Sequence, residues 1–196
     1  MSSPLPSKNQ MGIWIRNYLR HPLQVGAILP SGNSLSSLMT ARVRISSPEG
    51  YVVELGSGTG SFTRALVSQG VPQNRLILIE SSKEFVSYLK QVYPAATVVH
   101  GNAADIGYHL RLIGIRTVDH VVSGVPLVSC NKETRERICD AVLNSLNSGG
   151  SFVQVTYFWM CPIPQRIIRN YNAKRIFSGV AKWNMPPGFV WRVEKP

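Results

Sequence analysis

Short apolar runs recur along the chain from residue 50 onward, and amphipathic stretches separate them. The apolar runs predict seven strands, at YVVEL (51–55), RLILIE (75–80), ATVVH (96–100), VDHVVS (118–123), SFVQVTY (151–157), KRIFS (174–178) and FVWRV (189–193). The stretches between them predict helices over 60–69, 82–93, 104–113 and 132–147. Continuous apolar strands are typical of a parallel sheet that is covered on both faces. The pattern therefore predicts an α/β fold with a Rossmann-like, doubly wound, mostly parallel seven-stranded sheet.

A helical pattern precedes these strands. In MGIWIRNYLRHPLQ, which begins at Met11, apolar and basic side chains fall on different faces of a helical wheel. The apolar face holds Met11, Trp14, Ile15 and Tyr18, with Leu19 at its edge, and the basic face holds Lys8, Arg16 and Arg20. Pro22 ends or bends this helix. ILPSGNSLSSLM then predicts a turn and a second helix with a serine or asparagine as N-cap. We expect an amphipathic N-terminal arm over 1–30 and a single domain over 31–196.

The charge of the chain is concentrated at its two ends. The formal net charge is +11 over 196 residues, yet residues 51–150 hold nine basic and eight acidic side chains. Residues 151–196 hold seven basic side chains and a single acid, Glu194. A polyanion such as an anionic lipid surface or a nucleic acid would therefore meet the ends of the chain. Three cysteines without metal-ligand spacing favour a reduced cytosolic setting and predict no metal site. No signal peptide and no apolar run long enough to span a membrane is visible in the sequence.

The most informative motif is VVELGSGTGSFT, in which an apolar strand leads through a glycine-rich turn into a helix. Glycines permit a tight turn and a close approach of the backbone to a ligand. The spacing is G-x-G-x-G, not the G-x-G-x-x-G of dinucleotide sites, and Glu54 would repel a pyrophosphate. A ligand that carries both an ammonium group and a carboxylate, such as S-adenosylmethionine, suits this turn better.

Polar residues also follow the next strands. Glu80 ends the second strand, where an acid hydrogen-bonds ribose hydroxyls in this architecture, and Gly101-Asn102 follow the third, where they could hold adenine. The alternatives for the glycine-rich turn are a tight connection between strand and helix that binds nothing, and a site for NAD. The pattern over about residues 50–160 resembles the class I S-adenosylmethionine-dependent methyltransferases. The expected cofactor-binding residues are Glu54, Gly56, Ser57, Gly58, Thr59, Gly60, Glu80, Ser81, Gly101, Asn102, Ala103, Ser123, Gly124 and Pro126.

The loop after the fourth strand bears on the substrate. Enzymes that methylate a base flipped out of a nucleic acid are similar to one another in this loop, where a polar residue and an aromatic residue lie next to proline. The aromatic ring stacks on the base. In this chain the register gives Gly124-Val125-Pro126-Leu127, without either group. The loop argues against adenine or cytosine methylation, although the net charge favours a nucleic acid.

Four stretches extend the resemblance over nearly the whole chain. LRHPLQVGAILPSGNSLSSLM, VVSGVPL, FVQVTY and WNMPPGFVWRV occur in an order similar to that of the bacterial PmtA-type phospholipid N-methyltransferases. This resemblance implies successive methylation of phosphatidylethanolamine towards phosphatidylcholine, as a monomer on the inner face of the bacterial cell membrane. Ornithine lipid or another amino-lipid, a nucleic-acid adenine, a small molecule, and a cofactor-binding or lipid-binding protein without turnover are the alternatives. The chain departs from the family in having Asn102 where an aspartate is frequent.

Under this resemblance, further residues receive expected roles at the substrate. Tyr157 would contact the methylated, increasingly cationic amine through its ring, and Tyr18 would close over it from the arm. Trp14, Arg16, Arg20 and His21 would meet the membrane or its headgroups, with Lys174 and Arg175 as further candidates for the lipid phosphate. The alternative for the arm is a helix whose apolar face packs on the domain itself.

Overall fold

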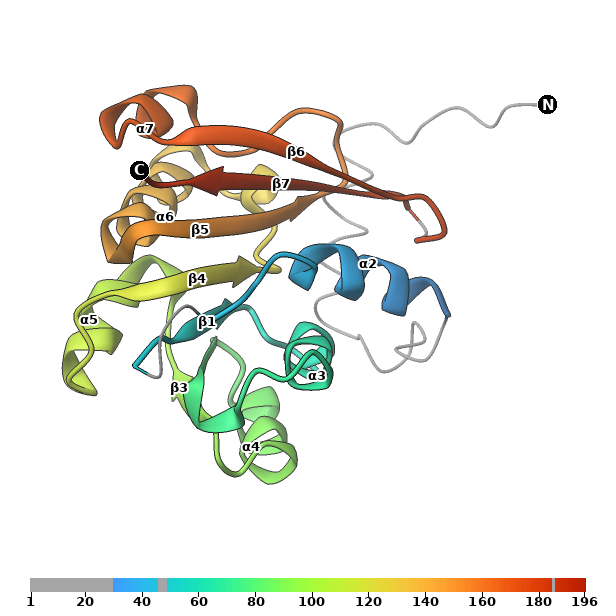
Figure 1. Cartoon of the computed structure of the whole chain (residues 1–196), viewed down its shortest axis with the longest axis vertical. Helices are drawn as coiled ribbons and strands as arrows, with labels where there is room; N and C mark the ends of the chain where they lie inside the picture. Colours follow the sequence, from blue (N-terminus) through green and yellow to red (C-terminus); the bar gives the residue numbers. More distant parts are fainter. Residues whose placement is uncertain (1–29, 46–48, 185) are drawn as a thin grey trace.

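The structure, a computed structural model, describes residues 30–45, 49–184 and 186–196. One seven-stranded sheet runs through the domain in the order β3-β2-β1-β4-β5-β7-β6 (Figure 1). Its strands are β1 (Val52–Leu55), β2 (Leu76–Glu80), β3 (Thr97–His100), β4 (Val118–Ser123), β5 (Leu146–Thr156), β6 (Lys174–Ala181) and β7 (Gly188–Glu194). Neighbouring strands pair in parallel except where β7 pairs with β5 and β6. The predicted fold class and all seven predicted strands are confirmed.

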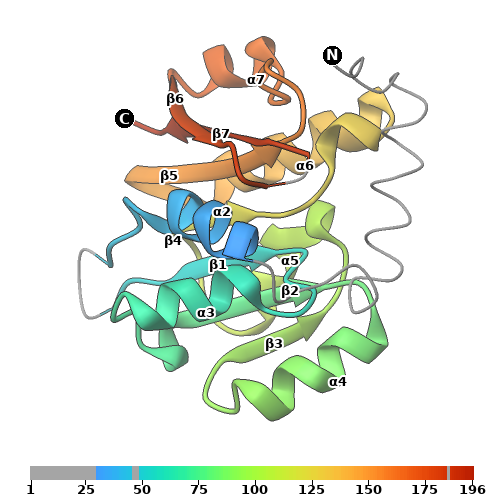
Figure 2. The same ribbon diagram turned by 90° about the vertical axis from the view of Figure 1, so that its right-hand side faces the viewer.

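Helices cover both faces of the sheet. They are α2 (Pro30–Thr40), α3 (Ser61–Ser68), α4 (Lys83–Val92), α5 (Ile106–Leu112), α6 (Lys132–Ser145) and α7 (Gln165–Asn170), with short 3-10 turns η1 (Gln73–Arg75), η2 (Ala103–Asp105) and η3 (Leu127–Ser129). One apolar core lies under α2, α3 and α4, and a second lies under α5, α6 and α7 (Figure 2). Strands β1, β2 and β4 are buried along their whole length, as their continuous apolar sequences predicted.

The junction of α6 and β5 differs from the prediction. The helix ends at Ser145 and the strand begins at Leu146, so the expected boundaries at 147 and 151 are wrong. Leu146 already pairs with Val118, and the register then shifts before His120 pairs with Ser151. Gly149 takes a φ of 76° inside this irregularity, a backbone conformation that favours glycine. The bulge lets strand pairing begin five residues earlier than the apolar run indicates.

Two helices also depart from the sequence-based expectation. The helix α2 begins at Pro30, so an N-cap at Ser31 or Asn33 is wrong because both lie inside the helix. Proline suits the first position of a helix, where its missing N–H group has no partner to lose. The helix α7 is not predicted at all, because its six residues are too short to establish a periodic pattern.

Chain direction brings the candidate loops together. The strands β1, β2, β3, β4 and β5 run the same way, so their carboxyl ends share one edge of the sheet. We call this the carboxyl edge. Since β6 is antiparallel to β7, which is antiparallel to β5, the end of β6 lies at the carboxyl edge too. In an open α/β sheet this is the edge at which ligands bind.

Candidate functional site

The turn after β1 has the backbone that its glycines predict. Gly56, Gly58 and Gly60 have φ values of 67°, 50° and 74°. A Cβ atom on Gly60 would lie 2.7 Å from the ring of Tyr93, so this position has no room for a side chain. A Cβ atom on Gly58, in contrast, would meet nothing within 4 Å. The middle of the turn therefore faces open space at the carboxyl edge, where a ligand can reach the backbone.

Glu54 lies beneath this turn and is 1% exposed. Its Oε2 atom accepts a short hydrogen bond from the hydroxyl of Thr63 on α3. Its Oε1 atom is buried and has no hydrogen-bond partner among the described residues. Burial raises the pKa of Glu54 to about 8; the Thr63 bond lowers the pKa and the nearby Glu80 carboxylate raises it further. An unpartnered buried carboxyl oxygen is costly, and a cationic ligand group would compensate for that cost.

Glu80 ends β2 and braces the same turn. Its Oε2 atom accepts from the backbone N–H of Gly58 at 2.9 Å, and its Oε1 atom accepts from the N–H of Ser82 at 2.8 Å. The hydroxyl of Ser81 lies 3.3 Å from that Oε1 atom. A carboxylate has about four acceptor positions, so these bonds leave Glu80 capacity for hydroxyl groups of a ligand. Glu80 thus joins the glycine-rich turn to the end of the neighbouring strand.

The loop after β3 adds a third side to the candidate site. Asn102 is exposed, and its Oδ1 atom accepts from the N–H of Ala104 at 2.9 Å as the N-cap of η2. Gly101 donates its N–H to the Glu80 carbonyl at 2.9 Å, which ties this loop to β2. A Cβ atom on Gly101 would lie 2.2 Å from the ring of His109, so a side chain at this position would displace that ring. Ala103 follows as the first residue of η2.

The loop after β4 touches the glycine-rich turn directly. A Cβ atom on Gly124 would lie 3.2 Å from the carbonyl of Gly56, and one on Gly56 would lie 3.3 Å from Val125. Ser123 is fully buried and its hydroxyl accepts from the N–H of Val125 at 3.2 Å, so its side chain shapes the loop. Pro126 precedes η3. Because few side-chain atoms lie between the glycine-rich turn and the loop after β4, their backbones form one continuous surface at the carboxyl edge.

Two residues that organise this surface are not among those expected from the sequence. Thr63 bonds Glu54, and Gln154 on β5 donates from Nε2 to the carbonyls of Val125 at 2.9 Å and Val155 at 2.6 Å. Gln154 is fully buried, and its Oε1 atom has no hydrogen-bond partner among the described residues. The one available signal was a glutamine in the middle of the apolar run FVQVTY.

The expected substrate residues are placed less completely. Tyr157 directly follows β5 at the carboxyl edge and is half-buried there. Tyr18, Trp14, Arg16, Arg20 and His21 lie outside the described residues. The expectation for Lys174 and Arg175 is corrected, because both lie at the start of β6 and therefore at the opposite edge of the sheet. Arg175 stacks there over the ring of Trp191 at 5.7 Å.

The residues at the carboxyl edge fit S-adenosylmethionine. The buried Oε1 atom of Glu54 can take a cationic group, the open side of Gly58 admits a ligand to the backbone, and Glu80 retains acceptor capacity for hydroxyls. The exposed Asn102 and the loop around it border the same edge. This set would hold one cationic, one hydroxyl-bearing and one flat polar part of a ligand, and S-adenosylmethionine has all three parts.

Comparison with known proteins gives the same assignment. The sequence profile of a family described as "Methyltransferase domain" matches residues 52–150, half of the chain. A curated relative, the ornithine lipid N-methyltransferase of Singulisphaera acidiphila, is 28% identical over 179 residues, which cover 89% of this chain and 91% of the relative. The match therefore extends well beyond the glycine-rich turn.

Solved structures show the same fold at low sequence identity. The 1,6-didemethyltoxoflavin-N1-methyltransferase of Burkholderia thailandensis, with bound S-adenosylhomocysteine, has a TM-score of 0.68 at 13% identity and covers 100% of this chain and 93% of its own. The magnesium protoporphyrin IX methyltransferase of Synechocystis PCC 6803, with bound S-adenosylmethionine, has a TM-score of 0.63 at 14% identity and covers 100% of both chains. The chain belongs to the methyltransferase domain family and is an S-adenosylmethionine-dependent methyltransferase.

Proposed function

We propose that the chain methylates the amine of a membrane amino-lipid at the membrane surface. The observation that carries this proposal is a group of exposed apolar side chains at the carboxyl edge. Trp159 and Met160, 71% and 54% exposed, follow the end of β5, and Trp183, 84% exposed, follows the end of β6. Tryptophan side chains favour the interface between a bilayer and water. The edge that holds the cofactor site would thus face the lipid.

The similarity to a lipid-modifying enzyme supports the same class of substrate. The relative from Singulisphaera acidiphila is named for ornithine lipid, whereas the resemblance found in the sequence implies phosphatidylethanolamine. Both lipids present a primary amine at the level of the headgroups. We propose phosphatidylethanolamine or ornithine lipid as the acceptor, with the amine approaching the surface that the glycine-rich turn and the loop after β4 form together.

The residues of the chain would act mainly by positioning. Bound S-adenosylmethionine supplies a methyl group on a sulfonium, which is already a good leaving group. Gln154 holds the carbonyl of Val125 and thereby fixes the loop that faces the acceptor. The half-buried ring of Tyr157 would stabilise the methylated ammonium through cation–π contact, worth about 0.5–2 kcal/mol. The amine must arrive without its proton, because an ammonium group has no lone pair.

A pair of matched variants tests the role of this edge. We expect Trp183→Ala to lower the rate of methyl transfer into phosphatidylethanolamine or ornithine-lipid vesicles by about thirtyfold, because a tryptophan buried in the interface contributes about 2 kcal/mol. Leu112→Ala, at a residue 66% exposed near the end of α5, is the control. Cofactor affinity should be unchanged in both variants. Equal transfer rates for Trp183→Ala and Leu112→Ala would contradict membrane docking through this edge.

A further inference from the structure

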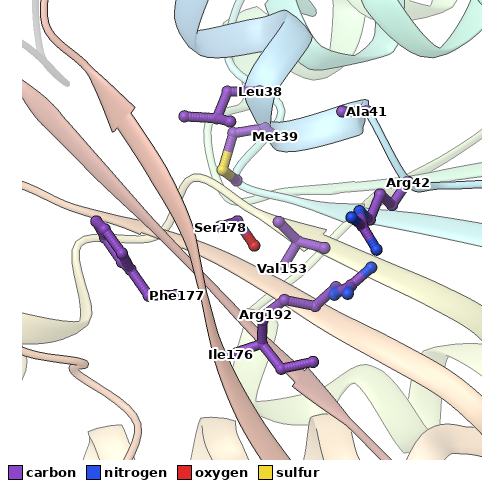
Figure 3. A pocket seen from close by; sticks show the side chains of 9 residues that line it. All are labelled: Leu38, Met39, Ala41, Arg42, Val153, Ile176, Phe177, Ser178 and Arg192. Atoms are coloured by element: carbon purple, nitrogen blue, oxygen red, sulfur yellow. The ribbon is translucent and has the colours of Figure 1, made fainter.

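A hollow lies away from the glycine-rich turn, between the end of α2 and the outer strands β5, β7 and β6 (Figure 3). Its volume is about 150 Å³, which is room for several water molecules. Its floor is a row of cross-strand neighbours, Val153, Arg192 and Ile176. The end of α2 and the turn after it form the roof and contribute Met39 and Arg42. The hollow is a site separate from the one that holds the cofactor.

Two arginines from different elements converge in this hollow. The guanidinium groups of Arg42 and Arg192 point toward each other across it (Figure 3). Arg192 is only 9% exposed, its Nη2 atom lies 3.0 Å from Glu194, and its buried Nε atom has no hydrogen-bond partner among the described residues. Arg42 is exposed and forms no ion pair with any residue that the structure describes. Two positive charges therefore face one space with a single carboxylate nearby.

Nothing acidic lies between these two arginines. Of the described residues that line the hollow none is an aspartate or glutamate, and Glu194 is not part of the lining. Converging like charges repel each other, and apolar walls such as Met39, Val153 and Ile176 reduce the screening by water. An anion between the guanidinium groups would convert this repulsion into two attractive interactions. The arrangement is thus more favourable with an anion than without one.

The donors in the hollow suit a phosphate group in particular. Guanidinium groups present planar pairs of N–H donors that match the oxygens of a phosphate. The hydroxyl of Ser178 on β6 points toward the same hollow and offers a third donor (Figure 3). We propose that this hollow binds a phosphate group between Arg42 and Arg192, carried either by a membrane lipid or by a free small molecule. The proposal holds whatever the methyl acceptor is.

Thermal unfolding of the full chain in inorganic phosphate tests this site. Phosphate is titrated against chloride at constant ionic strength, with Arg42→Gln as the variant and Arg116→Gln as the control. Arg42 and Arg116 are both exposed, so neither substitution disturbs the core, and each removes one positive charge. Phosphate should raise the Tm of the wild type and of Arg116→Gln alike. Arg42→Gln should need about tenfold more phosphate for the same rise, because it loses a charge-assisted hydrogen bond.

The same variants distinguish the two sources of the phosphate. A short-chain phosphatidylglycerol, kept below its micelle concentration, replaces inorganic phosphate in the titration. If this lipid raises the Tm more than inorganic phosphate does, and if the rise depends on Arg42, the hollow binds lipid headgroups. Arg42-dependent stabilisation by inorganic phosphate alone assigns it to free phosphates. The same response to both anions in Arg42→Gln and Arg116→Gln would overturn the proposal. Arg192→Lys, which keeps the charge and loses the planar fork, should weaken phosphate binding as well.

Discussion

Glu54 is the residue whose environment says most about the chemistry of the site. It lies at the end of a fully buried strand, one oxygen is held by Thr63, and the other has no partner among the described residues. Removal from water is the main reason why its pKa is raised to about 8. The carboxyl is therefore mostly protonated at neutral pH until a cation approaches it. Both the stability of the protein and its affinity for a cationic ligand should depend on this proton.

The first prediction concerns stability. Because the folded pKa of Glu54 lies above its unfolded value, the folded state binds an extra proton between these values, and stability is lost as pH rises through that window. Between pH 5 and pH 8 the loss attributable to Glu54 is about 3 kcal/mol. Urea unfolding at both pH values should show this loss in the wild type and in Glu133→Gln, which alters an exposed glutamate. In Glu54→Gln the free energy of unfolding should fall less between these two pH values than it does in the wild type, by the amount attributed to Glu54. The same pH dependence in Glu54→Gln and the wild type would contradict the raised pKa.

The second prediction concerns the cofactor. A cationic group beside Glu54 favours the charged carboxylate, so binding should release a proton below pH 8. The affinity for S-adenosylmethionine should therefore rise by up to about tenfold per pH unit between pH 6 and pH 7.5. Calorimetry in buffers of different ionisation enthalpy measures the proton directly. In Glu54→Gln the release should disappear, and an equal release in that variant would assign the proton to another group.

How far single residues could be predicted depends on how local their interactions are. Glu54, Gly58 and Glu80 stand in a recognisable order because one strand–turn–helix segment and the next strand end supply them. Gln154 could not be predicted in its role, because the carbonyl it holds belongs to Val125 in a loop 29 residues away. Only the pairing of β4 with β5 brings these two residues together.

At the scale of elements, the loop after β4 is held by its neighbour β5. Gln154 lies beside Ser123 in the parallel pairing, and both residues bond the backbone of Val125. Gly124 lies against the backbone of the glycine-rich turn, so displacement of this loop would disturb both loops at once. Gln154 is thus a positioning residue, which acts through the loop and not on the reacting atoms.

The third prediction follows from this arrangement. Gln154→Leu removes the hydrogen bonds that Gln154 donates to the carbonyls of Val125 and Val155, so that the Val125 carbonyl keeps the bond from the N–H of Leu127, and should destabilise the fold by about 1 kcal/mol. It should lower kcat for methyl transfer by about tenfold or more, because small displacements of a positioned group are costly. Ser151→Ala removes a buried hydrogen bond to His120 from the middle of β5, away from the loop after β4, and is the control. If both variants lose stability but keep the same kcat, the positioning role is wrong.

The elements themselves were predictable where burial dictates a pattern. The strands β1, β2 and β4 are buried along their length and read as apolar runs. The start of β5 could not be read in this way, because the residues of its bulge, Asn147 to Gly149, are polar or glycine. The direction of β6 is not encoded in a local pattern either, which is why Lys174 and Arg175 were expected near the substrate and lie at the far edge.

At the scale of the whole molecule, the carboxyl edge combines the candidate cofactor site with exposed tryptophans. Trp159 and Trp183 flank β7 at this edge, on loops that follow β5 and β6. No helix of the described residues is long and apolar enough to cross a membrane. We propose that the exposed tryptophans of this edge and the predicted amphipathic segment around Trp14 and Arg16 make the contact with a bilayer.

The fourth prediction concerns that segment. A chain that lacks residues 1–21 should lose most of its binding to vesicles that contain phosphatidylglycerol, since both the apolar and the basic face of the predicted helix are removed. Binding is measured by co-sedimentation, with affinity for S-adenosylmethionine as the check that the domain is folded. Undiminished vesicle binding by the shortened chain would show that the N-terminal segment is not the membrane contact.

The identity of the methyl acceptor is decided by transfer from labelled S-adenosylmethionine. The full chain is offered phosphatidylethanolamine vesicles, ornithine-lipid vesicles, bulk RNA and no acceptor, and the products are separated by thin-layer chromatography. We predict label in mono-, di- or trimethylated lipid, and the better lipid of the two identifies the headgroup. Label in RNA, or cofactor binding without transfer to either lipid, would contradict the assignment to membrane amino-lipids while leaving the methyltransferase fold and its cofactor site in place.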